Sequence, residues 1–187
     1  MARTPSTMVT LGTPAPDFAL PDVRTGALVH LGDFASRRAL LVMFICRHCP
    51  YVKHVEQELA RLGRDYATPS RDVAIVAISS NDARAYPDDA PASLAEQARL
   101  AGFVFPYLHD DSQDIARAYD AACTPDFFLY DASRTLVYRG QLDESRPQSG
   151  VPVTGRDLRA ALDLVLAGSP VPAAQVPSLG CNIKWRA

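Results

Sequence analysis

The stretch L-L-V-M-F-I-C-R-H-C-P-Y, from Leu40 to Tyr51, decides how the rest of this chain folds. Its first six residues are apolar and contain no turn residue, which is typical of a strand buried on both faces of a parallel sheet. Cys46 and Cys49 follow in a C-x-x-C arrangement. Pro50 suits the first turn of a helix, because its missing N–H would be unpaired there. The motif therefore places sulfur at the positive end of a helix dipole, where a thiolate is stabilised.

Length, composition and charge restrict the class of protein. The chain has 187 residues, of which 48% are apolar and 21% charged, so we expect one globular domain over residues 1–187. The formal net charge of -2 argues against nucleic-acid and membrane partners. Residues 1–12 are expected to form a loose leader, and they lack the apolar segment of a secretory signal. The missing signal indicates a cytoplasmic protein. In that compartment four cysteines favour redox chemistry over a static disulfide framework.

The remaining pattern predicts an α/β chain. The helix after Pro50 is followed by a second buried strand over Asp72–Ser79, and this order requires a right-handed parallel crossover. The polar loop Ser80–Pro91 then lies at the sheet edge where sites form. Further expected elements are two short strands around Arg24–Gly26, a helix with a capping box at Ser93, a strand over Phe103–Leu108, a helix capped by Asp111 or Ser112, a hairpin of Asp126–Tyr130 with Leu136–Arg139, and a helix from Thr154 to Gly168.

This order of elements resembles the thioredoxin fold. The opening A-P-D-F-A-L-P-D, at Ala15–Asp22, resembles the peroxiredoxin branch of that superfamily, the branch of alkyl hydroperoxide reductase and thiol-specific antioxidant proteins. C-R-H-C-P-Y-V-K at 46–53 and P-S-L-G-C-N-I-K-W at 177–185 resemble the peroxiredoxin-like proteins of the thioredoxin family. The resemblance implies a central mixed sheet flanked by helices, an N-terminal β-hairpin, and a C-terminal tail over residues 169–187 that packs on the domain.

The resemblance also assigns a place to Thr124 and Pro125. In thioredoxins a Pro with a cis peptide bond faces the two cysteines, and Pro125 stands where that Pro would be. The backbone of Thr124 would then pair with a bound peptide as an added strand. Cys123 and Cys181 are candidate extra redox thiols. For each of them, packing as a small buried side chain is the more common role.

Two departures from the peroxiredoxin pattern bear on the chemistry. Peroxiredoxins use P-x-x-x-T-x-x-C, in which the Thr and a distant Arg hold the peroxide. Matching Cys49 to the final Cys puts Cys46 at the Thr position and Val42 at the Pro position, while Pro125 takes the place of the Arg. A second thiol thus replaces the groups that polarise the O–O bond, which favours dithiol chemistry over peroxide chemistry.

The resemblance leaves two assignments of the attacking sulfur. In thioredoxins the first Cys attacks, which would be Cys46. An ungapped match of the buried strand, together with Pro50 in the first helical turn, instead favours Cys49 as the low-pKa thiolate and Cys46 as its disulfide partner. Arg47 and His48 add positive charge between the two sulfurs, which is expected to lower the thiolate pKa.

We therefore expect a thiol–disulfide oxidoreductase that uses Cys46 and Cys49 and needs no cofactor or metal. Its partners would be a disulfide-containing protein or small molecule and a cellular thiol reductant, and it could form oligomers. One alternative is a thiol-dependent peroxidase in which Cys49 attacks. Alternatives of another class are a non-catalytic thioredoxin-fold scaffold and a zinc site, whose ligands would be Cys46, Cys49 and two of Cys123, Cys181, His48 and His54.

Overall fold

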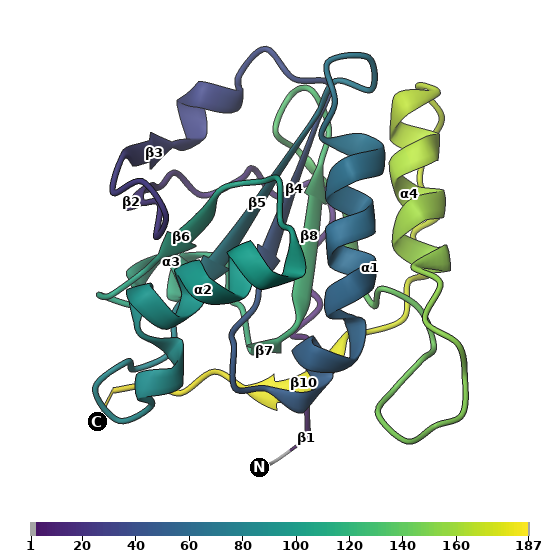
Figure 1. The fold of residues 1–187 in the computed structure, drawn as a ribbon. Helices are drawn as coiled ribbons and strands as arrows, with labels where there is room; N and C mark the ends of the chain where they lie inside the picture. The colour runs from purple at the N-terminus through teal and green to yellow at the C-terminus, as the bar shows by residue number, and fades with distance from the viewer. Residues whose placement is uncertain (1–2, 187) are drawn as a thin grey trace.

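A mixed five-stranded sheet forms the centre of the computed structural model, which describes residues 3–186 (Figure 1). The strand order is β6-β5-β4-β8-β9. The middle strand β4 runs parallel to β5 and antiparallel to β8; β6 is parallel to β5, and β9 is antiparallel to β8. The expected α/β architecture with a central mixed sheet is therefore confirmed. The strands are β4 (Ala39–Phe44), β5 (Val73–Ser79), β6 (Tyr107–His109), β8 (Asp126–Tyr130) and β9 (Leu136–Gly140).

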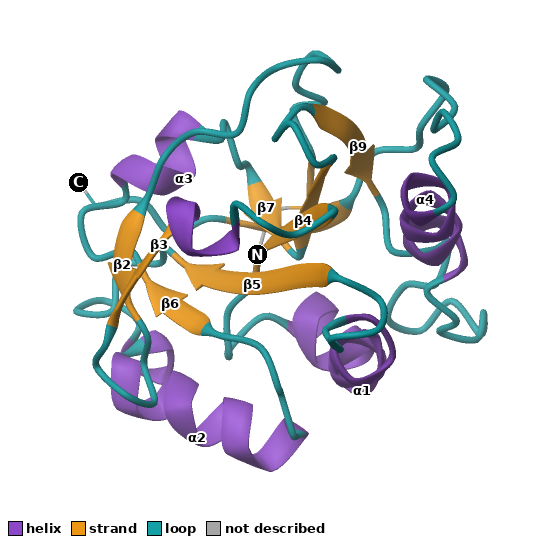
Figure 2. Cartoon of the chain, turned by 90° about the horizontal axis from the view of Figure 1, so that it is seen from above, coloured by secondary structure: helices purple, strands orange, loops and turns teal. Residues whose placement is uncertain are grey.

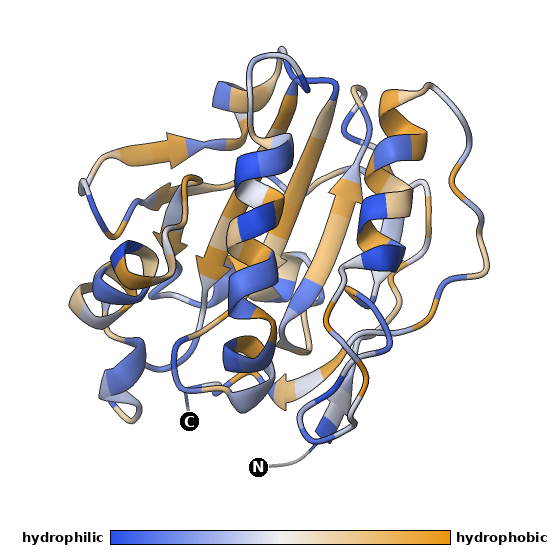
Figure 3. Ribbon diagram, turned by 45° about the vertical axis from the view of Figure 1, so that its right-hand side comes forward, coloured by the Kyte–Doolittle hydropathy of each residue, from blue (hydrophilic) through white to orange (hydrophobic). Residues whose placement is uncertain are grey.

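Helices cover both faces of this sheet (Figure 2). One face carries the long helix α1 together with α2 and α4, and the other carries α3 and the hairpin of β2 and β3. The strands are apolar, whereas the polar side of α1 faces outward (Figure 3). The helices are α1 (Pro50–Tyr66), α2 (Pro91–Ala101), α3 (Asp114–Ala118) and α4 (Arg156–Leu166), and the hairpin strands are β2 (Ala19–Pro21) and β3 (Leu28–His30).

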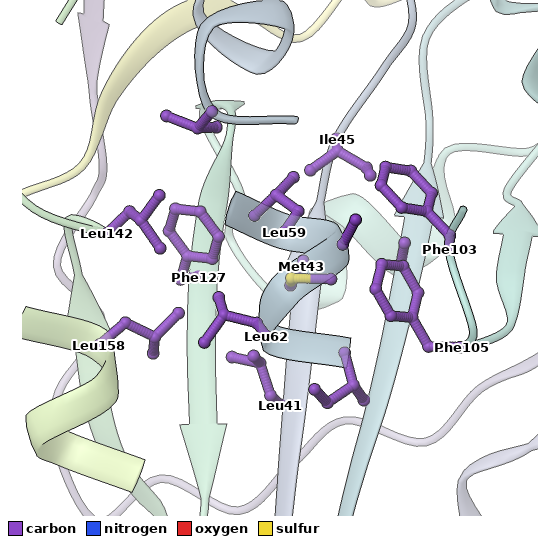
Figure 4. Packing of buried hydrophobic residues seen from close by; sticks show 14 of the residues in the cluster. Leu41, Met43, Ile45, Leu59, Leu62, Phe103, Phe105, Phe127, Leu142 and Leu158 are labelled. Atoms are coloured by element: carbon purple, nitrogen blue, oxygen red, sulfur yellow. The ribbon is translucent and has the colours of Figure 1, made fainter. Parts of the chain in front are cut away.

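The alternation of side chains along β4 divides the core into two clusters. Leu41 and Met43 point toward α1, where they pack with Leu59 and Leu62 (Figure 4). Their neighbours on β4 point to the other face, toward α3. Because a strand places successive side chains on opposite faces, an unbroken apolar run satisfies both cores at once. This explains why β4 fixes the position of the residues that follow it.

A second, three-stranded sheet has the order β1-β10-β7. It corrects the expectation of a loose leader, because β1 (Arg3–Pro5) pairs with β10 (Leu179–Asn182) of the tail. β10 pairs on its other side with β7 (Cys123–Thr124). The first two residues of the expected leader, and the last residue of the tail, lie outside the described residues.

Several expected boundaries are wrong for tertiary reasons. α2 begins at Pro91, and the Oγ of Ser93 donates to the Pro87 carbonyl instead of capping the helix. The residue before α3 is Gln113 and not the expected Asp111 or Ser112, although the Oγ of Ser112 does accept the backbone N–H of Asp114, the first residue of the helix. α4 is preceded by Gly155, one residue after the expected Thr154. The strand expected over Phe103–Leu108 pairs only as β6. Two short 3-10 helices, Leu31–Phe34 and Pro87–Asp89, were not expected.

Within residues 3–186, no helix combines the length and the apolar character needed to cross a lipid bilayer.

Candidate active site

The two cysteines of the C-x-x-C motif lie between the end of β4 and the start of α1. Cys49 is the residue that caps α1, with extended backbone angles, and Pro50 occupies the first turn, as the sequence predicts. Cys46 and Cys49 are both completely buried. The motif is therefore held by rigid elements on both sides and covered by other parts of the chain.

The sulfur of Cys49 has an environment that favours the thiolate. The pKa of Cys49 is lowered to about 5, first by a hydrogen bond from the Cys46 thiol, which outweighs the opposing effect of burial. Cys181 and the backbone N–H of Val52, in the first turn of α1, lower it further. The carbonyl oxygen of Thr124, 3.2 Å from Cys49 Sγ, can only accept a hydrogen bond and so favours the protonated thiol. The donors prevail.

Cys46 has the opposite character. Burial raises its pKa well above the ordinary thiol value, and its hydrogen bond to Cys49 and the nearby charge of Asp89 raise it further. Its Sγ lies 3.3 Å from the Oγ1 of Thr124. Cys49 is thus the more acidic thiol of the pair, ionised near neutral pH, and Cys46 is the protonated one.

Asp89 organises the loop between the two cysteines, although the sequence pattern indicates for it only a place in a polar loop after β5. One of its oxygens accepts the backbone N–H groups of Arg47 and His48. The other accepts from Asn81 and lies 2.5 Å from the Nδ1 of His48. Burial opposes ionisation of Asp89, but the hydrogen bonds from His48 and Asn81 outweigh it and lower its pKa.

The same contacts change the expected effect of the two basic residues. Arg47 forms an ion pair of 2.9 Å with Glu96, and His48 is bound to Asp89. Each basic side chain is therefore matched by a carboxylate, and the positive charge that they add next to the sulfurs is smaller than expected.

The Thr124–Pro125 peptide bond is cis, and Thr124 lies against both sulfurs. The backbone of Thr124 is paired with Cys181 of the chain's own tail, where we had expected a bound peptide. Cys123 points elsewhere, with its Sγ 3.5 Å from the Pro125 carbonyl oxygen, and burial raises its pKa. Cys181 is brought to 2.8 Å from Cys49, sulfur to sulfur. The site thus joins three of the four cysteines.

A metal site was an alternative, and the structure groups a different set of ligands from the expected one. One ligand atom each of Cys46, His48 and Asp89 lie within 4.8 Å of one another. His54 is instead hydrogen-bonded to Ser145. Both oxygens of Asp89 already accept hydrogen bonds, and the high pKa of Cys46 opposes the deprotonation that a metal ligand requires. These residues therefore fit a metal ion poorly.

The family model of the AhpC/TSA family matches residues 11–139, and the chain belongs to this family. It is also similar over its length to two solved structures. An uncharacterized conserved protein from Geobacillus kaustophilus is 53% identical, with a TM-score of 0.96 over 100% of this chain and 97% of the other. A hypothetical protein from Sinorhizobium meliloti 1021 is 52% identical, with a TM-score of 0.95 over 98% and 99% of the two chains.

More distant structures share the fold. The peroxidoxin BcpB from Mycobacterium tuberculosis is 19% identical, with a TM-score of 0.62 over 84% of this chain and 96% of the other. The thioredoxin domain of a thiol-disulfide oxidoreductase from Bacteroides vulgatus is 20% identical, with a TM-score of 0.57 over 74% and 90%. No curated protein gave a significant match. The chain is a peroxiredoxin-like protein of thioredoxin fold, and its family supports a thiol-based redox function.

Proposed function

We propose that the protein is a thiol–disulfide oxidoreductase whose working dithiol is Cys46 and Cys49. The observation that carries the proposal is the unequal pair of thiols, with the pKa of Cys49 lowered to about 5 and that of Cys46 raised by burial. A dithiol enzyme needs one sulfur that is ionised and attacks, and a neighbour that attacks only afterwards. Thr124, which precedes the cis peptide bond to Pro125, borders the pair from the facing segment.

The reaction consumes one disulfide and oxidises the dithiol. The Cys49 thiolate attacks one sulfur of the substrate disulfide, and the other substrate sulfur leaves as a thiolate and takes up a proton. A mixed disulfide between Cys49 and the substrate remains. The protein then forms the Cys46–Cys49 disulfide as the second substrate thiol departs with the proton of Cys46. A cellular thiol reductant restores the dithiol.

The test is the reduction of hydroxyethyl disulfide with dithiothreitol as the reductant. Cys49→Ser is expected to reduce the rate to the uncatalysed level, whereas Cys123→Ser, which removes a buried thiol hydrogen-bonded to the Pro125 carbonyl, is expected to retain activity. Peptide mapping of the oxidised wild type should find the Cys46–Cys49 bond. An active Cys49→Ser variant, or an oxidised wild type without this bond, would refute the proposal.

The second candidate is a thiol peroxidase, which the family membership favours. Cys49 would attack the peroxide, release an alcohol or water, and become a sulfenic acid that condenses with Cys46 and loses water. The side-chain hydroxyl of Thr124, in the facing segment, lies 3.3 Å from Cys46 Sγ, and a hydrogen bond from it is also one of the causes that lower the pKa of Cys49. Peroxide consumption by the same variants separates the two activities. A peroxidase would consume peroxide much faster than hydroxyethyl disulfide.

We also propose that the protein works in the cytoplasm, where a thiol reductant is at hand. Cell fractionation with an antibody tests this location.

A further inference from the structure

The tail strand β10 occupies the backbone edge beside Pro125 that we expected a substrate to use. Thr124 pairs with Cys181, and Cys123 with Asn182, in antiparallel register. On its other side β10 is covered by β1, which pairs Arg3 with Cys181. Figure 1 shows β10 next to β7 and beneath the start of α1. The chain's own tail therefore fills the place of an added strand.

The tail can approach the backbone of Thr124 closely because it has a glycine, Gly180, at the point of contact. A Cβ atom on Gly180 would lie 2.0 Å from the carbonyl oxygen of Thr124, so only glycine fits there. Hydrogen bonds hold the tail on both sides of this point: the Oγ of Ser178 donates to Pro125, and the backbone N–H of Ile183 donates to Ala122. The strand is thus seated on the facing segment along its length.

This seating carries one sulfur into the active site. Cys181 lies 132 positions after Cys49 in the chain, yet their Sγ atoms are 2.8 Å apart. Cys181 is almost completely buried, and burial raises its pKa to about 12. Cys181 therefore keeps its proton while Cys49 is ionised. Cys49 would react first with a disulfide, and Cys181 would react afterwards with the mixed disulfide on Cys49.

We propose that Cys181 is a third redox thiol of the site, which releases the substrate from Cys49 by forming a Cys49–Cys181 disulfide that Cys46 then resolves. The proposal rests on the proposed function and replaces its direct release of the substrate by Cys46 with two successive exchanges. Because β10 fills the edge on which a protein substrate would pair, it also makes a small disulfide the substrate class.

The relay balances in two exchanges. In the first, the sulfur of Cys181 bonds to Cys49 Sγ of the mixed disulfide, and the substrate sulfur leaves and takes up the proton of Cys181. In the second, the sulfur of Cys46 bonds to Cys49 Sγ, and Cys181 leaves and takes up the proton of Cys46. Two electrons have passed from Cys46 and Cys49 to the substrate, and Cys181 is restored.

The test blocks the second exchange. Reduced Cys46→Ser protein is mixed with one equivalent of hydroxyethyl disulfide, quenched with acid, alkylated and mapped by mass spectrometry. The expected product is a Cys49–Cys181 bond with no bound mercaptoethanol. In Cys46→Ser/Cys181→Ser the mixed disulfide on Cys49 should last at least about tenfold longer, because an intramolecular thiol acts at a high effective concentration. Cys46→Ser/Cys123→Ser is the matched control and should still form the bond.

The outcomes separate the two proposals. If Cys46→Ser keeps mercaptoethanol on Cys49 while Cys181 remains open to alkylation, the relay is refuted and the dithiol function stands. If neither variant reacts with the disulfide and the oxidised wild type lacks a Cys46–Cys49 bond, the proposed function itself fails. The decisive mapping leaves Cys181 in place, so it does not depend on the folding of a Cys181 variant.

Discussion

Removing the thiol of Cys46 should raise the pKa of Cys49, because the hydrogen bond from Cys46 is the largest cause of its low value. A hydrogen bond to a charged group contributes about 1.5–3 kcal/mol, and about 1.4 kcal/mol corresponds to one pKa unit. Cys46→Ala should therefore move the pKa of Cys49 from about 5 to between about 6 and 7. At pH 6 the ionised fraction would fall from about nine-tenths to about a quarter for a pKa near 6.5.

The measurement is the ultraviolet absorbance of the thiolate as the reduced protein is titrated. The other three thiols have raised pKa values, so the change between about pH 4 and pH 8 belongs to Cys49. Cys181→Ala should give a smaller increase, since its hydrogen bond is a weaker cause. Cys123→Ala should leave the titration unchanged. An unchanged or lower pKa in Cys46→Ala would refute this account of the site.

Three further predictions concern stability. Gly180→Ala should lower the free energy of unfolding by about 1–3 kcal/mol in a denaturant titration, because the new methyl group would overlap the backbone of Thr124. Gly32→Ala, which has open space around it, should change the free energy of unfolding little. Equal effects of the two substitutions would contradict the argument. Asp89→Asn should lower the free energy of unfolding by about 2–3 kcal/mol, because the uncharged amide accepts less well from the backbone of Arg47 and His48 and from Asn81, whereas the same change at exposed Asp88 should be nearly neutral in thermal melts. The low pKa of Cys49 contributes stability that is fully present above the unfolded value of about 8.5 and is lost as the pH falls through about 5. The free energy of unfolding of the reduced wild type, relative to that of Cys49→Ser, should therefore increase as the pH is raised from about 5 to about 8.5. A difference that does not change with pH would contradict the lowered pKa.

The local sequence determines the parts of the site that depend on neighbouring residues. The apolar run of β4 supplies both core clusters as a buried strand, and Pro50 suits the first turn of a helix, so a dozen residues predict the position of Cys49 as the helix cap. The antiparallel hairpin of β8 and β9 is likewise predicted from neighbouring residues, because a short turn sequence joins two apolar strands.

Contacts between distant segments were decided only by the tertiary structure. The order of strands and helices places the loop after β5 at the same edge of the sheet as the C-x-x-C motif, but no local pattern shows that Asp89 is the side chain that binds there. Cys181 reaches Cys49 because backbone hydrogen bonds seat β10 on β7 and because Gly180 has no side chain to hold the two apart. A sequence shows that a cysteine lies in a tail, but the sulfur that it meets depends on strand pairing, which is fixed by the whole fold.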